Sequence, residues 1–262
     1  MKIFLPQNIF SKLIRAVVEF DLIQDGDKIL IGLSGGKDSL FLTYALAALR
    51  ERIARKFSLT ALTIDPKFDD NFKICAEELK NFCEKLEIPH KILETDIAGA
   101  IAAQKNKKPC FTCAYFRRAA VNRTANEIFA NKVAYAHHLD DAVETFFMSL
   151  LSSGQLTTFQ PKTFLSRTNI TVIRPLVYFR ESEIEKFTAE NNFGVLKSPC
   201  PIDGTTNRQT VKNLIADLGK TFPDLFSHLS SAMRKNSVGE LWDAEKTKQE
   251  MKKIYFSYMK NS

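Results

Sequence analysis

Two hydrophobic patterns alternate along the first 153 residues. Short apolar runs are typical of strands buried on both faces of a parallel sheet, and they occur at 28–33, 59–64, 91–93 and 132–136. Apolar residues at helical spacing lie before and between these runs, at 8–20, 39–55, 71–85 and 116–130. The alternation predicts an α/β domain over 1–153, with a parallel sheet flanked by helices and the leading helix packed across the sheet edge.

The pattern changes after residue 154. A stretch rich in Thr, Ser and Pro at 154–168 predicts a loop, and a short strand is predicted at 171–174. Helical spacing then dominates, at 181–191, 208–218, 223–234 and 239–260. Residues 154–262 are therefore predicted to form a mostly helical C-terminal region.

Composition narrows the class of protein. The 262 residues are 45% hydrophobic and 26% charged, which is typical of a soluble globular chain. No run of about 18 apolar residues is present and the first residues lack a secretory pattern, so we expect a cytoplasmic protein without membrane association. The net charge of +7 permits binding to a polyanion, although an ordinary basic protein has the same charge. Five cysteines in a reducing compartment do not predict a disulfide framework.

A glycine loop joins the first predicted strand to its helix. It reads Ser34-Gly35-Gly36-Lys37-Asp38-Ser39. The backbone N–H groups of such a loop and the amino end of the helix bind phosphate, and Lys37 adds a positive charge. The Walker pattern fails at Ile31 and Asp38, and the dinucleotide-binding pattern fails at Ser34.

The loop resembles the S-G-G-x-D-S signature of the PP-loop pyrophosphatases, which cleave ATP between its α and β phosphates. This resemblance implies AMP-forming chemistry. Asp65 ends the second predicted strand, where open α/β sheets bind nucleotides, and it is either a ligand of ribose, adenine or metal or simply a turn residue. The implied ATP site comprises Leu33, Ser34, Gly35, Gly36, Lys37, Asp38, Ser39, Ile64, Asp65, Ala136 and Asp141.

Three cysteines are candidate metal ligands. Cys110 and Cys113 form a Cys-x-x-Cys before a predicted helix, and this pair alone suits a redox disulfide, half of a zinc site or iron–sulfur ligands. A closed zinc site is not favoured, because the chain has no second Cys-x-x-Cys and no H-x₃₋₅-H pattern. With Cys200 as a third ligand, a cubane cluster would keep one iron open to another group.

The chain resembles the tRNA 2-thiocytidine synthetase family, the TtcA-like PP-loop ATPases, over nearly its whole length. The other matching segments are Cys110–Thr124, Ala136-His137-His138-Leu139-Asp140-Asp141, Ile173-Arg174-Pro175-Leu176 and Pro199-Cys200 continuing into Asn207-Arg208. The resemblance implies a [4Fe-4S] cluster on Cys110, Cys113 and Cys200. The zinc ribbons of the related 2-thiouridine enzymes are absent, which favours the 2-thiocytidine branch.

Two positions depart from the family pattern. Ala136 replaces the usual glycine before His137, so a bound nucleotide would approach an additional methyl group. The residues after Cys200 lack a further cysteine that family members often carry, which argues against a mechanism with a fourth protein sulfur. Cys75 and Cys83 have no counterpart role, and we expect both to be buried, unreactive thiols of one helix.

Asp140 and Asp141 open the helix after the fourth predicted strand, which His137 and His138 end. Adjacent side chains on a helix diverge by about 100°, so the aspartates are not expected to form an acid–base dyad. Asp141 has the spacing of a capping box with Glu144, and the resemblance also gives it a place in the nucleotide site. A metal site on the two histidines is not favoured, because neighbouring side chains diverge on a strand.

Basic residues surround the Cys-x-x-Cys pair. Such a concentration is expected of a path for RNA phosphates, but a solvated helix face carries the same charges. Arg117 follows Cys113 by one helical turn, where the 2-thiouridine enzymes have a lysine, and it is the candidate for stabilising phosphate or the activated base. The candidate RNA-binding residues are Lys107, Lys108, Arg118, Arg123 and Arg208.

The resemblance implies ATP-dependent thiolation of a tRNA base, namely the anticodon-loop cytidine at position 32. Transfer of AMP to the C2 oxygen would create a leaving group, with Mg²⁺ on the released pyrophosphate and sulfur from a donor such as a cysteine desulfurase. The alternatives are 2-thiouridine formation, lysidine synthesis, or a non-catalytic iron–sulfur sensor that binds RNA, and a homodimer is left open. The candidate catalytic residues are Lys37, Asp38, Arg117 and Asp141.

Overall fold

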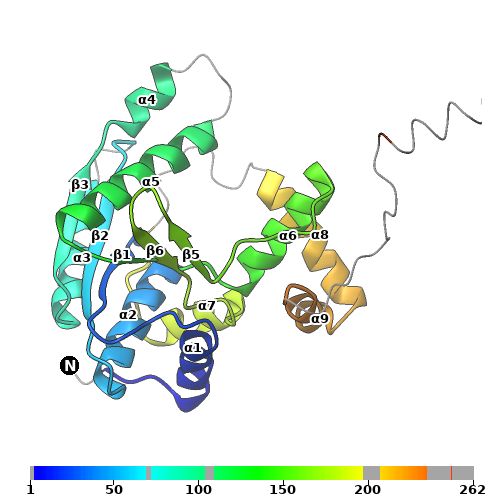
Figure 1. Ribbon diagram of the computed structural model, residues 1–262, viewed down its shortest axis with the longest axis horizontal. Coiled ribbons are helices and arrows are strands. Elements are labelled where there is room, and N and C mark those ends of the chain that lie inside the picture. Colours follow the sequence, from blue (N-terminus) through cyan, green and yellow to red (C-terminus); the bar gives the residue numbers. More distant parts are fainter. Residues whose placement is uncertain (1–2, 69–71, 104–108, 197–206, 235–248, 250–262) are drawn as a thin grey trace, which may run out of the picture.

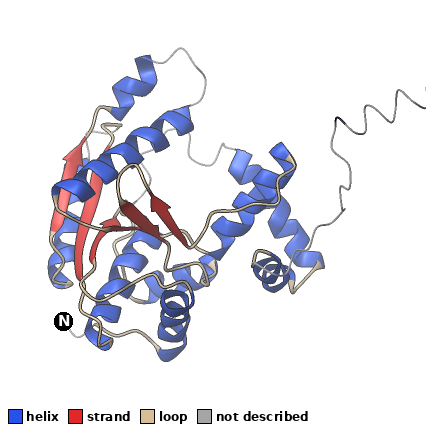
Figure 2. Cartoon of the chain, in the orientation of Figure 1, coloured by secondary structure: helices blue, strands red, loops and turns tan. Residues whose placement is uncertain are grey.

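A six-stranded sheet forms the centre of the described part of the chain (Figures 1 and 2). The computed structural model describes residues 3–68, 72–103, 109–196, 207–234 and 249. All neighbouring strands are parallel except one edge pair, β5 with β6, in the order β3-β2-β1-β4-β6-β5, so the predicted α/β class is confirmed. The strands are β1 (Lys28–Gly32), β2 (Ser58–Asp65), β3 (His90–Glu94), β4 (Lys132–Ala134), β5 (Lys162–Leu165) and β6 (Ile170–Ile173).

Helices cover both faces of this sheet. Ile29 and Ile31 of β1 are buried in the cluster that includes α1, α2 and α7, whereas Leu30 is buried in the cluster that includes α5. Successive side chains of a strand point to opposite faces, which explains why the strand runs are continuously apolar. The described helices are α1 (Gln7–Glu19), α2 (Lys37–Arg52), α3 (Phe72–Lys85), α4 (Ile97–Ala103), α5 (Pro109–Glu127), α6 (Leu139–Ser153), α7 (Glu181–Glu190), α8 (Asn207–Thr221) and α9 (Leu225–Ala232).

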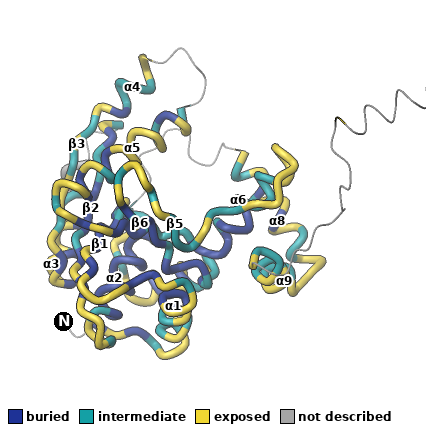
Figure 3. Tube along the Cα trace, viewed as in Figure 1, coloured by how far each residue is buried: buried dark blue, intermediate teal, exposed yellow. Residues whose placement is uncertain are grey.

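Helices α6, α8 and α9 form a second, smaller packing unit beside the sheet (Figure 1). Leu139 and Val143 of α6 share a buried cluster with Val211 and Ile215 of α8. Burial is densest in the central strands β1, β2, β4 and β6 and in α2, whereas the edge strands and α8 and α9 are mostly exposed or half-buried (Figure 3). No helix in the described ranges is long and apolar enough to cross a membrane.

The structure differs from the predicted elements in several places. The loop expected at 154–168 contains β5, a four-residue edge strand that pairs with β6 and has no fully buried position, so no apolar run marked it. The helix expected at 116–130 begins at Pro109, since proline suits a first helical turn, so both cysteines of the Cys-x-x-Cys lie inside α5. Helix α4 occupies a segment for which no element is predicted, and α1 packs against α2 rather than across the sheet edge.

A buried ion pair joins β4 to the segment before β1. Asp27 and Lys132 are only 4% and 5% exposed, and Lys132 Nζ lies 2.6 Å from Asp27 Oδ2. Lys132 Nζ also donates to the carbonyl of Leu22 at 2.8 Å, while Asp27 accepts from Gln24 N at 2.6 Å and from Asn131 Nδ2 at 2.8 Å. Buried charges are tolerated when they are paired and hydrogen-bonded in this way.

We expect Lys132→Met to lower the free energy of unfolding by about 3–5 kcal/mol, because it leaves the Asp27 carboxylate buried without its cation. Urea unfolding measures the change. Lys186→Met is the matched control, since Lys186 and Glu190 form a pair whose side chains are 75% and 61% exposed, and its unfolding midpoint should stay near that of the parent chain. Equal midpoints for both variants would contradict a stabilising role for the buried pair.

Candidate active site

The carboxyl ends of β1, β2, β4 and β6 border a cavity of about 870 Å³. Chain connections leave β1 toward β2 on one side and reach β4 on the other, and ligands of open α/β sheets bind at such a point. The cavity brings together most of the site residues predicted from sequence, namely Leu33, Ser34, Gly36, Asp38, Ser39, Ile64, Asp65, Arg117, Arg118, Ala136 and Asp141. Gly35 and Lys37 complete the glycine loop and contact neighbouring elements.

The glycine loop is held in shape by backbone and hydroxyl contacts. Gly35 has a φ of 84°, and a Cβ there would lie 2.6 Å from Leu196 Cδ1, so only glycine fits beneath Leu196. Leu196 N donates to the Gly35 carbonyl at 3.0 Å. The Ser39 hydroxyl accepts from Ser34 N at 3.1 Å and donates to the Gly36 carbonyl at 2.9 Å. Gly36 is the N-cap of α2 and supplies no side-chain cap, so the first N–H groups of α2 are available to an anion.

Two carboxylates flank His138 beside this loop. His138 Nε2 lies 3.8 Å from Asp38 Oδ1 and 3.4 Å from Asp141 Oδ2. Burial raises the pKa of Asp38 despite the nearby Lys37, and Asp38 Oδ1 has no hydrogen-bond partner among the described residues. A pair of carboxylates with unused oxygen capacity suits a divalent cation such as Mg²⁺.

Helix α6 begins with a capping box that differs from the predicted one. His138 N donates to Asp141 Oδ2 at 3.0 Å, and Asp141 N donates to His138 Nδ1 at 3.3 Å. The expected pairing of Asp141 with Glu144 is therefore wrong, because the N-cap is His138 and Asp141 is the third helical residue. An imidazole nitrogen takes the place of the usual Ser or Thr oxygen, and this substitution hid the box in the sequence.

A charged network ties the glycine loop to α7 and α8. Asp140 accepts from Arg180 Nε at 3.2 Å and from Glu181 N at 2.8 Å, which fixes the first turn of α7. Glu181 in turn lies 2.9 Å from Lys37 Nζ and 2.6 Å from Lys212 Nζ. Burial alone would raise the pKa of Glu181, but hydrogen bonds from Lys212 and Lys37 lower it to about 2. Sequence reasoning missed Glu181 and Lys212, since neither belongs to a motif that marks them.

Aromatic and basic side chains form the wall near β4 and β6. The His137 ring lies 5.8 Å from the Tyr135 ring and 5.1 Å from the Phe159 ring, and the Arg174 guanidinium lies 5.0 Å from the Phe159 centroid. Burial lowers the pKa of His137 to about 4, so this imidazole is neutral at neutral pH. Within the described ranges, His137 Nδ1 and Arg174 Nε are buried without hydrogen-bond partners. This wall offers stacking surface and unused polar atoms to a planar ring.

Helix α5 carries the cysteine pair along one side of the cavity. Ala114, Arg117 and Val121 line the cavity, and Cys110 and Cys113 precede Arg117 by about two turns and one turn, on the same side of the helix. Both cysteines are free thiols, Cys110 exposed and Cys113 half-buried. Arg117 Nε is buried and has no hydrogen-bond partner in the described part of the chain.

The remaining basic candidates are dispersed. Arg118 lines the cavity and is exposed, and Arg123 is exposed one and a half turns further along α5. Arg208 faces α6, with its Nε 3.0 Å from Glu144 Oε2 and its Nη2 3.7 Å from Asp141 Oδ1. The predicted residues Lys107, Lys108 and Cys200 and the helix expected at 239–260 lie outside the described residues, apart from residue 249.

The two cysteines of α3 differ from each other. Cys83 is fully buried, as expected, and burial raises its pKa to about 12. Cys75 is half-buried and lines the large cavity, so the expectation of a core thiol is wrong for this residue. The helical spacing of apolar residues predicts α3, but it does not predict which residues of that helix line a cavity.

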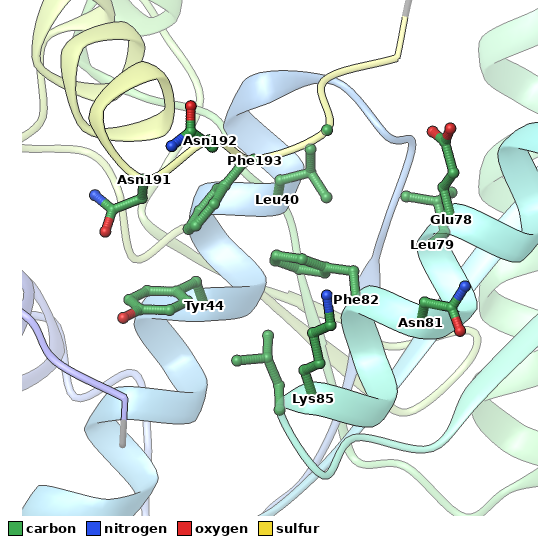
Figure 4. A pocket seen from close by; sticks show the side chains of 12 residues that line it. Leu40, Tyr44, Glu78, Leu79, Asn81, Phe82, Lys85, Asn191, Asn192 and Phe193 are labelled. Carbon is green, nitrogen blue, oxygen red and sulfur yellow. The ribbon is translucent and has the colours of Figure 1, made fainter. Parts of the chain in front are cut away.

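A second cavity, of about 410 Å³, lies between α2, α3 and residues 191–194 (Figure 4). The rings of Tyr44, Phe82 and Phe193 face into it. No residue of the glycine loop lines it, and Leu40 is the lining residue that lies next to that loop in the sequence. It contains none of the candidate catalytic residues. The chemistry-bearing side chains are therefore gathered at the larger cavity.

Known proteins share this arrangement of elements. A family model described as a PP-loop domain matches residues 6–217. The tRNA-cytidine(32) 2-sulfurtransferase of Dechloromonas aromatica is 34% identical over 236 residues, which cover 88% of this chain and 80% of that protein. The chain belongs to this family of PP-loop proteins. A 2-sulfurtransferase of the same description from Geobacter sulfurreducens is 35% identical over 88% of this chain and 90% of its own.

The fold of this chain also resembles that of a solved structure. The U34-tRNA thiolase NcsA from Methanococcus maripaludis, determined with its [4Fe-4S] cluster, has a TM-score of 0.71 and 23% sequence identity. The match covers 97% of this chain and 88% of that chain. The glycine loop at residues 34–39 lies within the range that the PP-loop family model matches, and we call it the PP-loop below.

We expect Asp38→Asn to raise the thermal midpoint of unfolding at neutral pH while abolishing AMP release. The folded-state pKa of Asp38 is raised above its unfolded value, so the ionised carboxylate destabilises the fold at neutral pH and asparagine removes that cost. The gain should shrink toward about pH 4, as wild-type Asp38 becomes protonated in the folded state. Calorimetry at both pH values measures the difference.

Asp217→Asn is the matched control, because the Asp217 side chain is 71% exposed on α8. Its midpoint should stay close to that of the parent chain. Unchanged midpoints for both variants, or full AMP release by Asp38→Asn, would contradict the assignment of Asp38 as a half-buried nucleotide-site carboxylate.

Proposed function

We propose that this protein transfers sulfur to C2 of cytidine 32 in tRNA, consuming ATP and releasing AMP. The observation that carries the proposal is the shared cavity, since the PP-loop, Asp38, Asp141 and the Arg117 side of α5 border a single space of about 870 Å³. ATP must activate the base and sulfur must then attack the same carbon, so both reactants have to reach one position. A common cavity allows this. The 2-sulfurtransferase relatives support cytidine as the target base.

The first step activates the base. The N–H groups of the loop and of α2 bind the phosphates, Lys37 adds positive charge, and Asp38 with Asp141 would hold the Mg²⁺ that accompanies ATP and would offset the phosphate charge. The C2 oxygen of the cytosine attacks the α phosphorus of ATP, and the bond from that phosphorus to the bridging oxygen breaks. Pyrophosphate leaves, and the base carries AMP on the former carbonyl oxygen.

The second step exchanges oxygen for sulfur. A sulfur nucleophile attacks C2, the C2–O bond breaks, and AMP leaves with the oxygen that came from the base. Arg117 stabilises the negative charge on this departing phosphate, because its Nε is buried and lacks a partner among the described residues. The wall of His137 and Phe159 holds the pyrimidine ring by stacking and limits access of water.

The cysteine pair fits an iron–sulfur cluster beside this cavity. Cys110 and Cys113 are free thiols near the start of α5, on the same side as Arg117, and thiolate sulfur is the ligand that such clusters take. Cys200, outside the described residues, would be the third ligand. When bound, a [4Fe-4S] cluster would supply an iron with an open coordination position to the sulfur donor.

The partners proposed for this reaction are tRNA and a sulfur donor such as a cysteine desulfurase, in the cytoplasm. Incubation of anaerobically purified protein with unmodified tRNA, Mg-ATP and sulfide tests the function, with mass spectrometry of the digested nucleosides as the readout. We expect 2-thiocytidine from position 32. Formation of 2-thiouridine or lysidine would replace the proposed substrate, and an iron-loaded protein that modifies no nucleoside would contradict the enzymatic function.

Alanine at Cys110, Cys113 or Cys200 should remove most of the iron and abolish thiolation, because each change deletes one of three cluster ligands. Cys83→Ala should retain iron and activity, since that thiol is buried in the core. Iron analysis and the yield of 2-thiocytidine measure both effects. Stoichiometric zinc without iron, together with full thiolation activity, would contradict the cluster assignment.

A further inference from the structure

We propose that the outer face of α5 binds unpaired nucleobases of the RNA substrate by stacking. Phe111, Tyr115 and Arg118 form this face, which we call the outer stripe. The proposal rests on the proposed tRNA-modifying function and extends it to two aromatic residues that no motif marks.

The aromatic residues of the outer stripe are unusually exposed. Phe111 is 66% exposed and Tyr115 is 59% exposed, although α4 packs against α5. The Tyr115 ring contacts the Phe116 ring edge-on, with 5.5 Å between the ring centroids, and this contact helps to hold the Tyr115 ring in place. Large apolar side chains gathered at the surface mark a face that binds a partner.

The stripe adjoins the cavity. Positions 111, 115 and 118 fall within an arc of about 60° on an α-helix, next to the face that carries positions 114, 117 and 121. Arg118 lies at the border of the two faces, since it is exposed and also lines the cavity. A nucleotide whose base enters the cavity therefore has its neighbours beside the stripe. Those neighbours lose stacking when the target base is extruded, and the aromatic rings replace it.

Charge identifies the partner as a nucleic acid. Arg118 belongs to the stripe and Arg117 lies beside it, while Glu127, the only acidic residue of α5, pairs with Arg123 on another side of the helix. Cationic side chains interleaved with exposed rings fit a chain that carries phosphates and planar bases. Single-stranded RNA has both, whereas the bases of a duplex are already stacked and paired.

Binding of an unmodified anticodon stem-loop RNA to Phe111→Ala and Tyr115→Ala tests the proposal, with fluorescence anisotropy at several salt concentrations as the measurement. We expect each variant to raise Kd by about tenfold or more, as base–aromatic stacking is lost. The slope of log Kd against log salt should stay unchanged, because no charge is removed. Arg118→Ala should instead flatten that slope, and Phe111→Tyr should retain the wild-type affinity.

Phe129→Ala is the matched control, since Phe129 is 79% exposed beyond the other end of α5, before β4 begins. It should bind as the parent chain does, and a fully paired RNA duplex should not distinguish any of the aromatic variants. Folding of each variant is checked by its ATP affinity and circular dichroism. A Kd within about twofold of the parent for both Phe111→Ala and Tyr115→Ala would overturn the stripe alone, whereas a parent chain that fails to bind tRNA would overturn the proposed function as well.

Discussion

The carboxylate of Glu181 holds the functional end of this molecule together. It contacts Lys37 of the PP-loop at 2.9 Å and Lys212 of α8 at 2.6 Å, and its backbone N–H is anchored by Asp140 of α6. Helix α7 packs on α2 and α8 packs on α6, so one half-buried charge connects the sheet layer with the smaller helical unit. Because the two lysines lower its pKa to about 2, Glu181 remains ionised throughout the physiological range and the connection persists.

The charged groups around Glu181 leave the cavity with two unlike halves. On the PP-loop side, Asp38 and Asp141 present carboxylate oxygens, and the amino end of α2 presents N–H groups, which suits Mg²⁺ and phosphate. On the β4 and β6 side, a neutral His137 packs edge-on against Tyr135 and at a tilt against Phe159. Buried atoms without partners within the described residues occur in both halves, at Asp38 and at His137. Buried polar atoms without hydrogen bonds lower the stability of a fold, and a bound ligand that forms those hydrogen bonds explains why they are present.

The parts of this site that sequence reasoning found are those with local signals. The PP-loop is six consecutive residues between a strand and a helix. All of its residues are neighbours in the sequence, so the motif can be found without knowledge of any long-range contact. Glu181 lies 144 residues from Lys37 in the sequence, and the spacing of apolar residues does not predict a contact between residues so far apart. Cys75 shows the same limit, because the helical pattern of α3 predicts the helix but not the cavity that opens beside it. The edge strand β5 was hidden because only one neighbour pairs with it and none of its four residues is fully buried.

The central claim is that the C2 oxygen of cytidine attacks ATP and leaves with AMP. An anticodon stem-loop RNA labelled with ¹⁸O at C2 of cytidine 32 tests this claim directly, through mass spectrometry of the AMP that accumulates during thiolation. We predict one ¹⁸O atom in AMP for each 2-thiocytidine formed. Thiolated RNA accompanied by unlabelled AMP would mean that ATP is hydrolysed separately, and it would contradict the account.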